Sequence, residues 1–395
     1  MLMVTLLNMF LNAASTGERS MNSTNNSPIT ERHRRATSAA TVTLFAAALL
    51  MTACGGGGDS PQRVESLGTH NEQWTLAAPG EVGMDAATLQ LALNDESFRS
   101  SIIVQRHGKP VLEHYWKGYD KNTLHEIRSA TKSITSLMTG IAIDKGVLKG
   151  VDQPISELLG AAYPGRPALT RNITVGHLLT MSSGLDCDDF DESSPGHQKN
   201  MYPTRDWPDF ILNLSQRSTP GTQARYCTGG VTTLGRAISE ASKLSVPAFA
   251  EQHLLAPLNI TTMKWVTYDN GKHSSAGGLA SLRPRDMLKI GQLVLQKGKW
   301  EGRQIVSEEW IAESTRSHVA LFPARNRYGY LWWFGTVPLG NRLLQVHYAS
   351  GNGGQYIFVI PELDMVVVFT GQNFNANTDT STFQILTQYI VGAVK

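Results

Sequence analysis

A serine and a lysine stand three residues apart in Ser129-Ala130-Thr131-Lys132, the only Ser-x-x-Lys run in the chain. On a helix, this spacing places both side chains on one face, where the lysine amine can reach the serine hydroxyl. A serine becomes a strong nucleophile when a neighbouring base takes its proton, and burial can lower the pKa of a lysine enough for that task. The apolar neighbours Ile127 and Ile134 are compatible with such burial. The same four residues also fit a serine that only caps a helix beside a solvated lysine.

A second candidate group is Tyr226, in the segment Pro220-Gly221-Thr222-Gln223-Ala224-Arg225-Tyr226-Cys227-Thr228. A phenol has an ordinary pKa near 10, so it needs a nearby positive charge, such as Lys132, to act as a base near neutral pH. Two residues later, the hydroxyl of Thr228 can donate or accept a hydrogen bond. The alternative for Tyr226 is a packed aromatic ring with a satisfied hydroxyl.

A third segment, Tyr348-Ala349-Ser350-Gly351-Asn352-Gly353-Gly354-Gln355, precedes an apolar strand. Glycines let a strand edge approach a substrate closely, and the edge offers backbone donors to it. A β-bulge that only bends the strand would also explain these glycines.

The elements that must position these residues follow from hydrophobic patterning. We predict strands over 101–106 and 111–117 around a turn at 107–110, and a buried helix from Ser129 to Asp144. Helices then follow at 174–181, 230–242 and 246–255. Strands return at 328–334, 343–348, 355–360 and 365–369, with a turn at 361–364 and a last helix over about 380–394.

Strands at both ends with helices between them predict an α+β fold. We expect one antiparallel sheet built from both chain ends and flanked by helices, plus a mainly helical lobe over about residues 130–295. With 41% hydrophobic and 17% charged residues, the chain has an ordinary globular composition. We therefore assign residues 75–395 to one domain.

Four blocks in this order resemble the serine β-lactamase-like superfamily. It includes class C β-lactamases, penicillin-binding proteins, esterases and aminohexanoate-dimer hydrolases, and it has a β-lactamase/transpeptidase-like fold. The resemblance spans roughly residues 75–395. The blocks are 129–146 around the Ser-x-x-Lys run, 173–185, 220–228 and 348–355.

The resemblance implies roles for single residues. Ser129 is the nucleophile, Lys132 its base and Tyr226 a second acid-base group, with the backbone amides of Ser129 and Asn352 forming an oxyanion hole. Thr228, Ser350 and Gly351 would bind substrate. The chain departs from the family where Thr228 replaces an asparagine and Ala349 replaces a lysine or histidine, which weakens recognition of a β-lactam and its carboxylate.

The implied activity is hydrolysis of an ester or small amide through an acyl-enzyme, without a cofactor or metal. A β-lactamase or a D-alanyl-D-alanine carboxypeptidase is the alternative, and a non-catalytic, lipid-anchored penicillin-binding-like protein is an alternative of another class. The histidines lack His-Glu-x-x-His spacing, and the chain has no Gly-x-Ser-x-Gly elbow. We expect Asp186-Cys187-Asp188-Asp189-Phe190-Asp191-Glu192 to be a solvated acidic loop rather than a calcium site.

The N-terminal part predicts export. The basic cluster Arg32-His33-Arg34-Arg35 precedes an apolar run from Ala39 to Leu50 and then Ala53-Cys54, the layout of a secretory signal. Cys54 before a glycine run resembles a lipoprotein processing site, so we predict a signal peptide over 1–53, lipidation of Cys54 and a linker over 54–74. A plain signal peptide or an uncleaved anchor is the alternative. The expected location is periplasmic or outer-membrane-tethered.

Two cysteines, Cys187 and Cys227, remain after Cys54. In an oxidising compartment they can form one disulfide, or they can stay as two buried thiols. The net charge is +2, and part of it lies in the N-terminal cluster, so we expect no nucleic-acid partner. The expected partner is a small-molecule ester, amide or lactam, with membrane contact only through the lipid anchor.

Overall fold

A computed structural model describes residues 74–94, 99–322, 326–376 and 379–395. The chain divides into compact units at Met1–Val64 and Glu65–Lys395, and the described residues belong to the second. The predicted signal peptide, Cys54 and nearly all of the predicted linker lie outside the described residues. Among the described residues, no helix is both long enough and apolar enough to cross a membrane.

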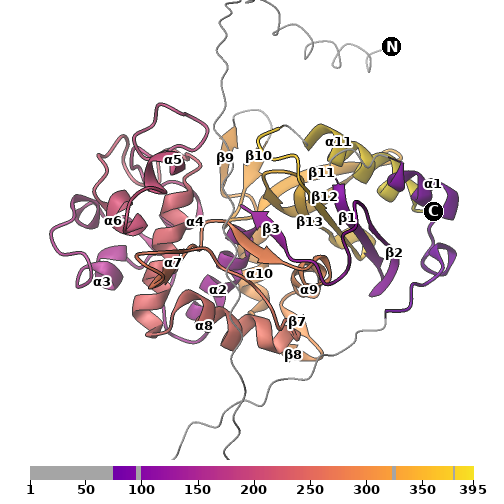
Figure 1. Cartoon of the computed structure of the whole chain (residues 1–395), viewed down its shortest axis with the longest axis horizontal. Coiled ribbons are helices and arrows are strands. Elements are labelled where there is room, and N and C mark those ends of the chain that lie inside the picture. Colours follow the sequence, from indigo (N-terminus) through magenta and orange to yellow (C-terminus); the bar gives the residue numbers. More distant parts are fainter. Residues whose placement is uncertain (1–73, 95–98, 323–325, 377–378) are drawn as a thin grey trace, which may run out of the picture. The chain divides into compact units, whose positions relative to one another are not determined.

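The central element is an antiparallel sheet with strand order β2-β1-β14-β13-β12-β11-β10-β9 (Figure 1). Strand β1 from the start of the domain pairs with β2 on one side and with C-terminal β14 on the other. The predicted α+β fold, with one antiparallel sheet from both chain ends, is confirmed. The strand bounds are β1 Arg99–Arg106, β2 Lys109–Tyr115, β9 Val319–Phe322, β10 Asn326–Tyr328, β11 Trp333–Leu339, β12 Arg342–Gly351, β13 Gln355–Ile360 and β14 Met365–Gly371.

Helices cover both faces of this sheet because its central strands are apolar on both sides. On one face, a Cβ placed on Gly291 of α9 would lie 2.5 Å from Val366 and 2.8 Å from Ile357, so this helix packs closely against β14 and β13. On the other face, the ring of Phe358 lies 5.2 Å from that of Phe383 in α11. Neighbouring residues 357 and 358 thus point to opposite faces, as the two-residue period of a strand requires.

The helices between β3 and β9 include a group packed around α7 (Figure 1). The buried helix predicted after Ser129 is α2, whose apolar residues Ile134, Leu137 and Ile141 are at most 1% exposed. The helix bounds are α1 Ala86–Gln90, α2 Thr131–Asp144, α3 Ile155–Leu159, α4 Val175–Leu179, α5 Gln198–Met201, α6 Trp207–Leu212, α7 Thr228–Ser242, α8 Val246–Ala250, α9 Pro284–Leu295, α10 Glu308–Thr315 and α11 Asp379–Ile385.

Short strand pairs and irregular turns complete the fold. The two-stranded pairs are β3 His125–Arg128 with β6 Ala280–Leu282, β4 Thr267–Tyr268 with β5 His273–Ser274, and β7 Lys299–Trp300 with β8 Arg303–Gln304. Helix α8 continues into a π-helical turn at Glu251–Leu255, and α11 continues into one at Leu386–Ile390. The last predicted helix therefore ends earlier than expected as regular α-helix.

The strand predicted over 328–334 is wrong. Residues 329–332 form a loop between β10 and β11. The amides of Tyr330 and Leu331 donate to the carbonyls of Ser314 and Leu179, which lie outside the sheet. A Cβ on Gly329 would lie 2.2 Å from the Ser314 carbonyl oxygen, and Leu331 has φ of 62°. Contacts with the helical part of the chain thus interrupt a run whose aromatic residues favour a strand.

Candidate active site

Ser129 lies at the junction between β3, which ends at Arg128, and α2, which begins at Thr131. Arg128 has φ of 49°, a left-handed conformation that costs about 1–2 kcal/mol for a residue with a side chain. The amide of Lys132 donates to the Ser129 carbonyl at 2.9 Å, so Ser129 sits at the entrance to the first turn. The helix therefore begins slightly later than predicted, but the three-residue spacing still places both side chains together.

The Lys132 side chain is buried, with 1% exposure, and its amine has three polar neighbours. Nζ donates to Ser129 Oγ at 3.1 Å, to Thr228 Oγ1 at 2.9 Å and to the carbonyl of Gly277 at 2.5 Å. Burial lowers the pKa of Lys132 to about 7, while the negative charge of Asp189 acts to raise it. Near neutral pH, a large fraction of this amine is therefore unprotonated and able to accept a proton.

Tyr226 is also buried and lies against the same pair. Its ring lies under the Lys132 ammonium, with Nζ 4.7 Å from the ring centroid, and it stacks with Trp333 at 5.8 Å. Burial raises the pKa of Tyr226, and a hydrogen bond with the Ser129 side chain acts in the opposite direction. The phenol stays protonated near neutral pH, so the expectation that Lys132 would make it a base is not supported. A protonated phenol here is suited to donating a proton.

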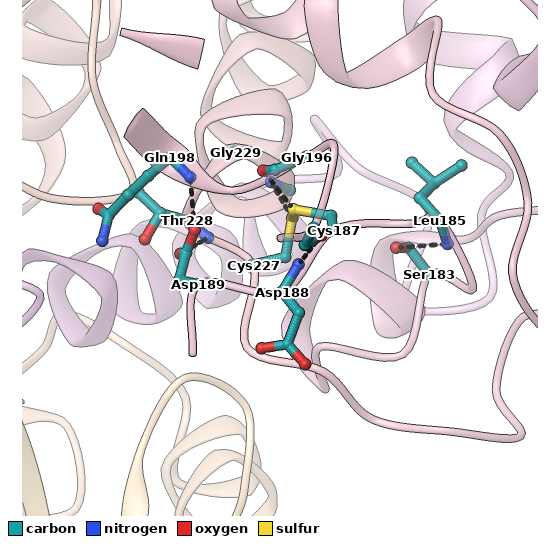
Figure 2. The surroundings of a disulfide bond; sticks show 12 residues. Ser183, Leu185, Cys187, Asp188, Asp189, Gly196, Gln198, Cys227, Thr228 and Gly229 are labelled. Carbon is teal, nitrogen blue, oxygen red and sulfur yellow. Dashed lines mark hydrogen bonds between the residues drawn. A yellow bond between two sulfur atoms is a disulfide. The ribbon is translucent and has the colours of Figure 1, made fainter. Parts of the chain in front are cut away.

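Thr228 begins α7, and its hydroxyl accepts a hydrogen bond from the Lys132 amine at 2.9 Å. Its backbone amide donates to Asp189 Oδ2 at 2.7 Å, and Asp189 Oδ1 accepts from the Gln198 amide at 2.8 Å. Figure 2 shows this carboxylate between Thr228 and Gln198. The acidic residues of the loop are partly or fully exposed, as expected, but Asp189 also joins the loop to α5 and α7 through these two hydrogen bonds.

A disulfide joins Cys187 to Cys227, with the sulfur atoms 1.99 Å apart (Figure 2). Cys227 stands between Tyr226 and Thr228, and its sulfur accepts the amide of Gly230 at 3.2 Å, which caps α7. The disulfide and the Asp189 carboxylate thus connect the acidic loop to the segment that carries Tyr226.

The end of β12 lies next to β3, the strand that precedes Ser129. A Cβ on Gly351 would lie 2.2 Å from the Ile127 carbonyl oxygen and 3.1 Å from the Arg128 Cβ. Gly351 is buried, so it brings two backbones together rather than lining the cavity. Ser350 precedes it at intermediate exposure, and Ala349 is fully buried in the sheet.

Asn352 follows β12 and lines the same cavity as Ser129. Its side chain holds Asn375 through two hydrogen bonds: Nδ2 donates to Asn375 Oδ1 at 2.9 Å, and Oδ1 accepts the Asn375 amide at 2.7 Å. This pair anchors the turn after β12 at the rim of the cavity.

The cavity at Ser129 has a volume of about 240 Å³. Most of its lining residues were not singled out for the site by the sequence patterns, and Arg128, Tyr202 and Gly277 are among them. A Cβ on Gly277 would lie 2.3 Å from the Thr228 carbonyl oxygen, so a side chain there would disturb the acceptor of the Lys132 amine. The adjacent pair Gly277-Gly278 before a short strand is the signal that could have indicated this segment. Among the described residues, no group of three or more His, Cys, Asp or Glu is arranged to hold a metal ion.

Comparison with known proteins shows what this chain is similar to. The 6-aminohexanoate-dimer hydrolase of Paenarthrobacter ureafaciens is 23% identical over 301 residues, which cover 69% of this chain and 72% of that protein. Two solved structures share the fold. The penicillin-binding protein homologue from Pyrococcus abyssi has a TM-score of 0.58 at 20% identity, covering 78% of this chain and 76% of that chain. EstCE1, a hydrolase with promiscuous acyltransferase activity, has a TM-score of 0.63 at 16% identity, covering 80% of this chain and 98% of that chain.

The family model named Beta-lactamase matches residues 99–388, a range that contains the Ser129-Lys132 pair, Tyr226 and the end of β12. This match spans most of the chain and all of the central sheet. The chain therefore belongs to the beta-lactamase family, and it is a hydrolase of that family.

Proposed function

We propose that this protein is a serine hydrolase that cleaves an ester or a small amide through an acyl-enzyme on Ser129. One observation carries the proposal: the buried Lys132 amine lies 3.1 Å from Ser129 Oγ, and its pKa is lowered to about 7. A lysine in this state can take the serine proton at neutral pH.

Acylation begins when Ser129 Oγ attacks the substrate carbonyl carbon and its proton moves to Lys132 Nζ. A bond forms between Oγ and the carbonyl carbon, and the carbonyl oxygen becomes an oxyanion. When this intermediate collapses, the bond to the leaving alcohol or amine breaks, and Tyr226 assists proton transfer to the leaving atom. Burial keeps Tyr226 protonated near neutral pH, so the phenol can give its proton to the leaving atom as it takes the serine proton from the Lys132 ammonium, which returns both groups to their starting states.

Deacylation reverses these steps with water as the nucleophile. Water attacks the acyl carbon as one of its protons moves to the neutral Lys132 amine, while Tyr226 keeps its proton. The bond between Ser129 Oγ and the acyl carbon then breaks, and Oγ takes the proton back from Lys132 as the acid product leaves. We assign the backbone amides of Ser129 and Asn352 to the oxyanion in both steps. Removal of one such donor commonly costs about 3 kcal/mol of transition-state stabilisation.

An ester or small amide is favoured over a β-lactam because of the two family positions that differ here. Thr228 offers a hydroxyl where the family has an amide side chain, and Ala349 is a buried methyl group where the family has a cation. Similarity to a 6-aminohexanoate-dimer hydrolase and to the hydrolase EstCE1 is in line with amide or ester cleavage. β-Lactamase or D-alanyl-D-alanine carboxypeptidase activity remains the second candidate, supported by the family match.

Steady-state kinetics of the wild type and of Ser129→Ala test the proposal. We expect the wild type to hydrolyse short-chain nitrophenyl esters with a higher kcat/KM than a chromogenic cephalosporin, and Ser129→Ala to lose both activities. Full ester hydrolysis by purified Ser129→Ala would rule out the proposal. A higher kcat/KM for the cephalosporin than for the esters would instead support the second candidate. Covalent labelling of Ser129 by a fluorophosphonate without hydrolysis of either substrate would indicate a non-catalytic binding protein.

We also propose that the domain acts outside the cytoplasm, tethered through Cys54. The Cys187–Cys227 disulfide supports export, because such bonds persist in oxidising compartments. Cell fractionation of wild type and Cys54→Ala tests this. Membrane-bound wild type and released Cys54→Ala are expected, whereas equal cytoplasmic recovery of both would contradict it.

A further inference from the structure

A second cavity lies apart from the cavity at Ser129, and the two have no lining residue in common among the described residues. Its volume is about 480 Å³, within the range of about 300–1,000 Å³ that is usual for small-molecule sites. The lining comes from β1, β2 and their turn, from α9 and from the β7–β8 hairpin, together with Trp74 (Figure 1). The proposed hydrolase mechanism uses none of these elements.

Two glutamine side chains form a polar pair in this second cavity. Gln105 of β1 is 8% exposed and Gln292 of α9 is 7% exposed, and both line the cavity. Gln105 Nε2 donates to Gln292 Oε1 at 2.6 Å. The Gln105 carbonyl oxygen and the Gln292 amide nitrogen then have no hydrogen-bond partner among the described residues. Because buried amides are costly when unpaired, this pair favours a ligand that supplies one donor and one acceptor.

Two indole rings, those of Trp74 and Trp300, add apolar surface to the same lining. The guanidinium carbon of Arg285 lies 4.5 Å from the centroid of the Trp74 ring. Arg285 is itself fixed, because its Nε and Nη2 donate to the two carboxylate oxygens of Glu113 at 2.7 Å each. Arg285 does not belong to the lining, so it supports the indole from outside the cavity. Trp74 is therefore held in place as a platform, as a binding site requires.

The charged residues of the lining do not favour an ionic ligand. The Lys289 amine donates to the Asn259 carbonyl at 2.9 Å and lies 3.6 Å from Asp286 Oδ1, so its charge is compensated within the protein. Glu301 is exposed, and its carboxylate can accept hydrogen bonds from hydroxyl groups but disfavours an anion. Water screens such an exposed charge, so a cation gains little from it. The cavity therefore favours a neutral ligand that carries hydroxyl groups.

We propose that this second cavity binds a neutral saccharide. The faces of a sugar ring carry C–H groups, which pack against the negative face of an indole. Two neighbouring sugar hydroxyls can donate to the Gln105 carbonyl oxygen and accept from the Gln292 amide. A quaternary ammonium ion could pack against the same rings, but it can use neither amide group. The domain thus has a glycan-binding function that is independent of the chemistry at Ser129.

Isothermal titration calorimetry of the full-length protein tests the proposal. The probes are maltose, cellobiose and N,N′-diacetylchitobiose, which are neutral disaccharides that differ in linkage and in their acetamido groups. We expect at least one of them to bind at one site per chain with a Kd of about 1 mM or below. Tetramethylammonium chloride is the cationic comparison, and we expect no binding of it.

Variants locate the binding. The double variant Gln105→Met with Gln292→Met keeps similar side-chain shapes and leaves no unpaired amide, so it should fold, and its Kd should rise by about tenfold or more. Trp300→Ala should also raise the Kd by about tenfold or more. The matched control is Trp265→Ala, which removes another partly buried indole and should leave the Kd unchanged. Circular dichroism checks the fold, and if Trp300→Ala misfolds, the double variant decides.

Three results would overturn the proposal. One is a wild-type protein that binds none of the three disaccharides. Another is a folded double variant or folded Trp300→Ala with the wild-type Kd, because the saccharide would then bind elsewhere on the protein. The third is binding of tetramethylammonium in place of the disaccharides, which would make the cavity a cation site.

Discussion

The amine of Lys132 lies 3.1 Å from the hydroxyl of Ser129, on a side chain that is 1% exposed. A fully charged ammonium would be costly in such a place, so burial lowers its pKa toward neutrality. The hydroxyl of Thr228 and the carbonyl of Gly277 complete the surroundings of this amine. The pair therefore combines the proposed nucleophile with an amine that is partly unprotonated at neutral pH and is its proposed base.

The first prediction concerns pH. Because the neutral form of Lys132 is the base and its pKa is about 7, kcat/KM should rise with pH below about 7 and level off above it. Lys132→Met should lower kcat/KM by about 100-fold or more and remove this rise. Lys145→Met, at the exposed C-terminal end of the same helix, is the control and should keep the wild-type profile. An unchanged profile in Lys132→Met would contradict the assignment of the base.

The second prediction concerns Asp189. Its negative charge acts to raise the pKa of Lys132, so Asp189→Asn should move the rising limb of the pH profile to lower pH. The variant also loses acceptor strength toward the Thr228 and Gln198 amides, so its unfolding free energy should fall by about 1–2 kcal/mol. Asp191→Asn in the same loop is the matched control. If the rise of kcat/KM in Asp189→Asn stays at the wild-type pH or moves to higher pH, the Asp189 charge does not raise the pKa of Lys132.

The third prediction concerns the disulfide. The disulfide between Cys187 and Cys227 closes a loop with a sequence separation of 40. Loss of this bond should lower the unfolding free energy by about 2–4 kcal/mol. The variant Cys187→Ala with Cys227→Ser keeps an oxygen acceptor at the start of α7, where Cys227 accepts the Gly230 amide. Denaturant unfolding of this variant and of reduced wild type should give similar losses. Equal stability of oxidised and reduced wild type would exclude a structural role for the bond.

The fourth prediction concerns Gly351. A methyl group there would lie 2.2 Å from the Ile127 carbonyl oxygen, so Gly351→Ala must push β12 away from β3. We expect an unfolding free energy lower by about 1–3 kcal/mol and a clear loss of kcat/KM, because the strand before Ser129 moves. Gly80→Ala, where no atom lies within 4 Å of the added methyl, serves as the control. Wild-type activity in Gly351→Ala would show that this contact does not position Ser129.

The sequence pattern was sufficient to predict the pairing of Ser129 with Lys132 and the burial of the helix that carries Lys132. The spacing of Ser129 and Lys132 needs only one helical turn, and the apolar face of α2 was visible in the sequence. The order of the blocks around Tyr226 and Gly351 then indicated the fold. These features do not require knowledge of which distant segments meet.

Contacts between distant segments could not be predicted in this way. Asp189 reaches the Thr228 amide across 39 residues, and the acidic run around it has the composition of a solvated loop. The run 328–334 favours a strand by composition, yet hydrogen bonds to Ser314 and Leu179 hold its middle as a loop. The placement of Arg128 in the cavity likewise depends on how β3 meets β12.

Covalent labelling tests the central claim most directly. The wild-type protein, treated with a fluorophosphonate until ester hydrolysis stops, is digested, and the modified peptide is sequenced by mass spectrometry. We predict one phosphonyl group per chain, on Ser129, with labelling that is absent in Ser129→Ala and much slower in Lys132→Met. Inactivation by modification of a different residue, or full ester hydrolysis by a protein completely modified at Ser129, would contradict the assignment of Ser129 as the nucleophile.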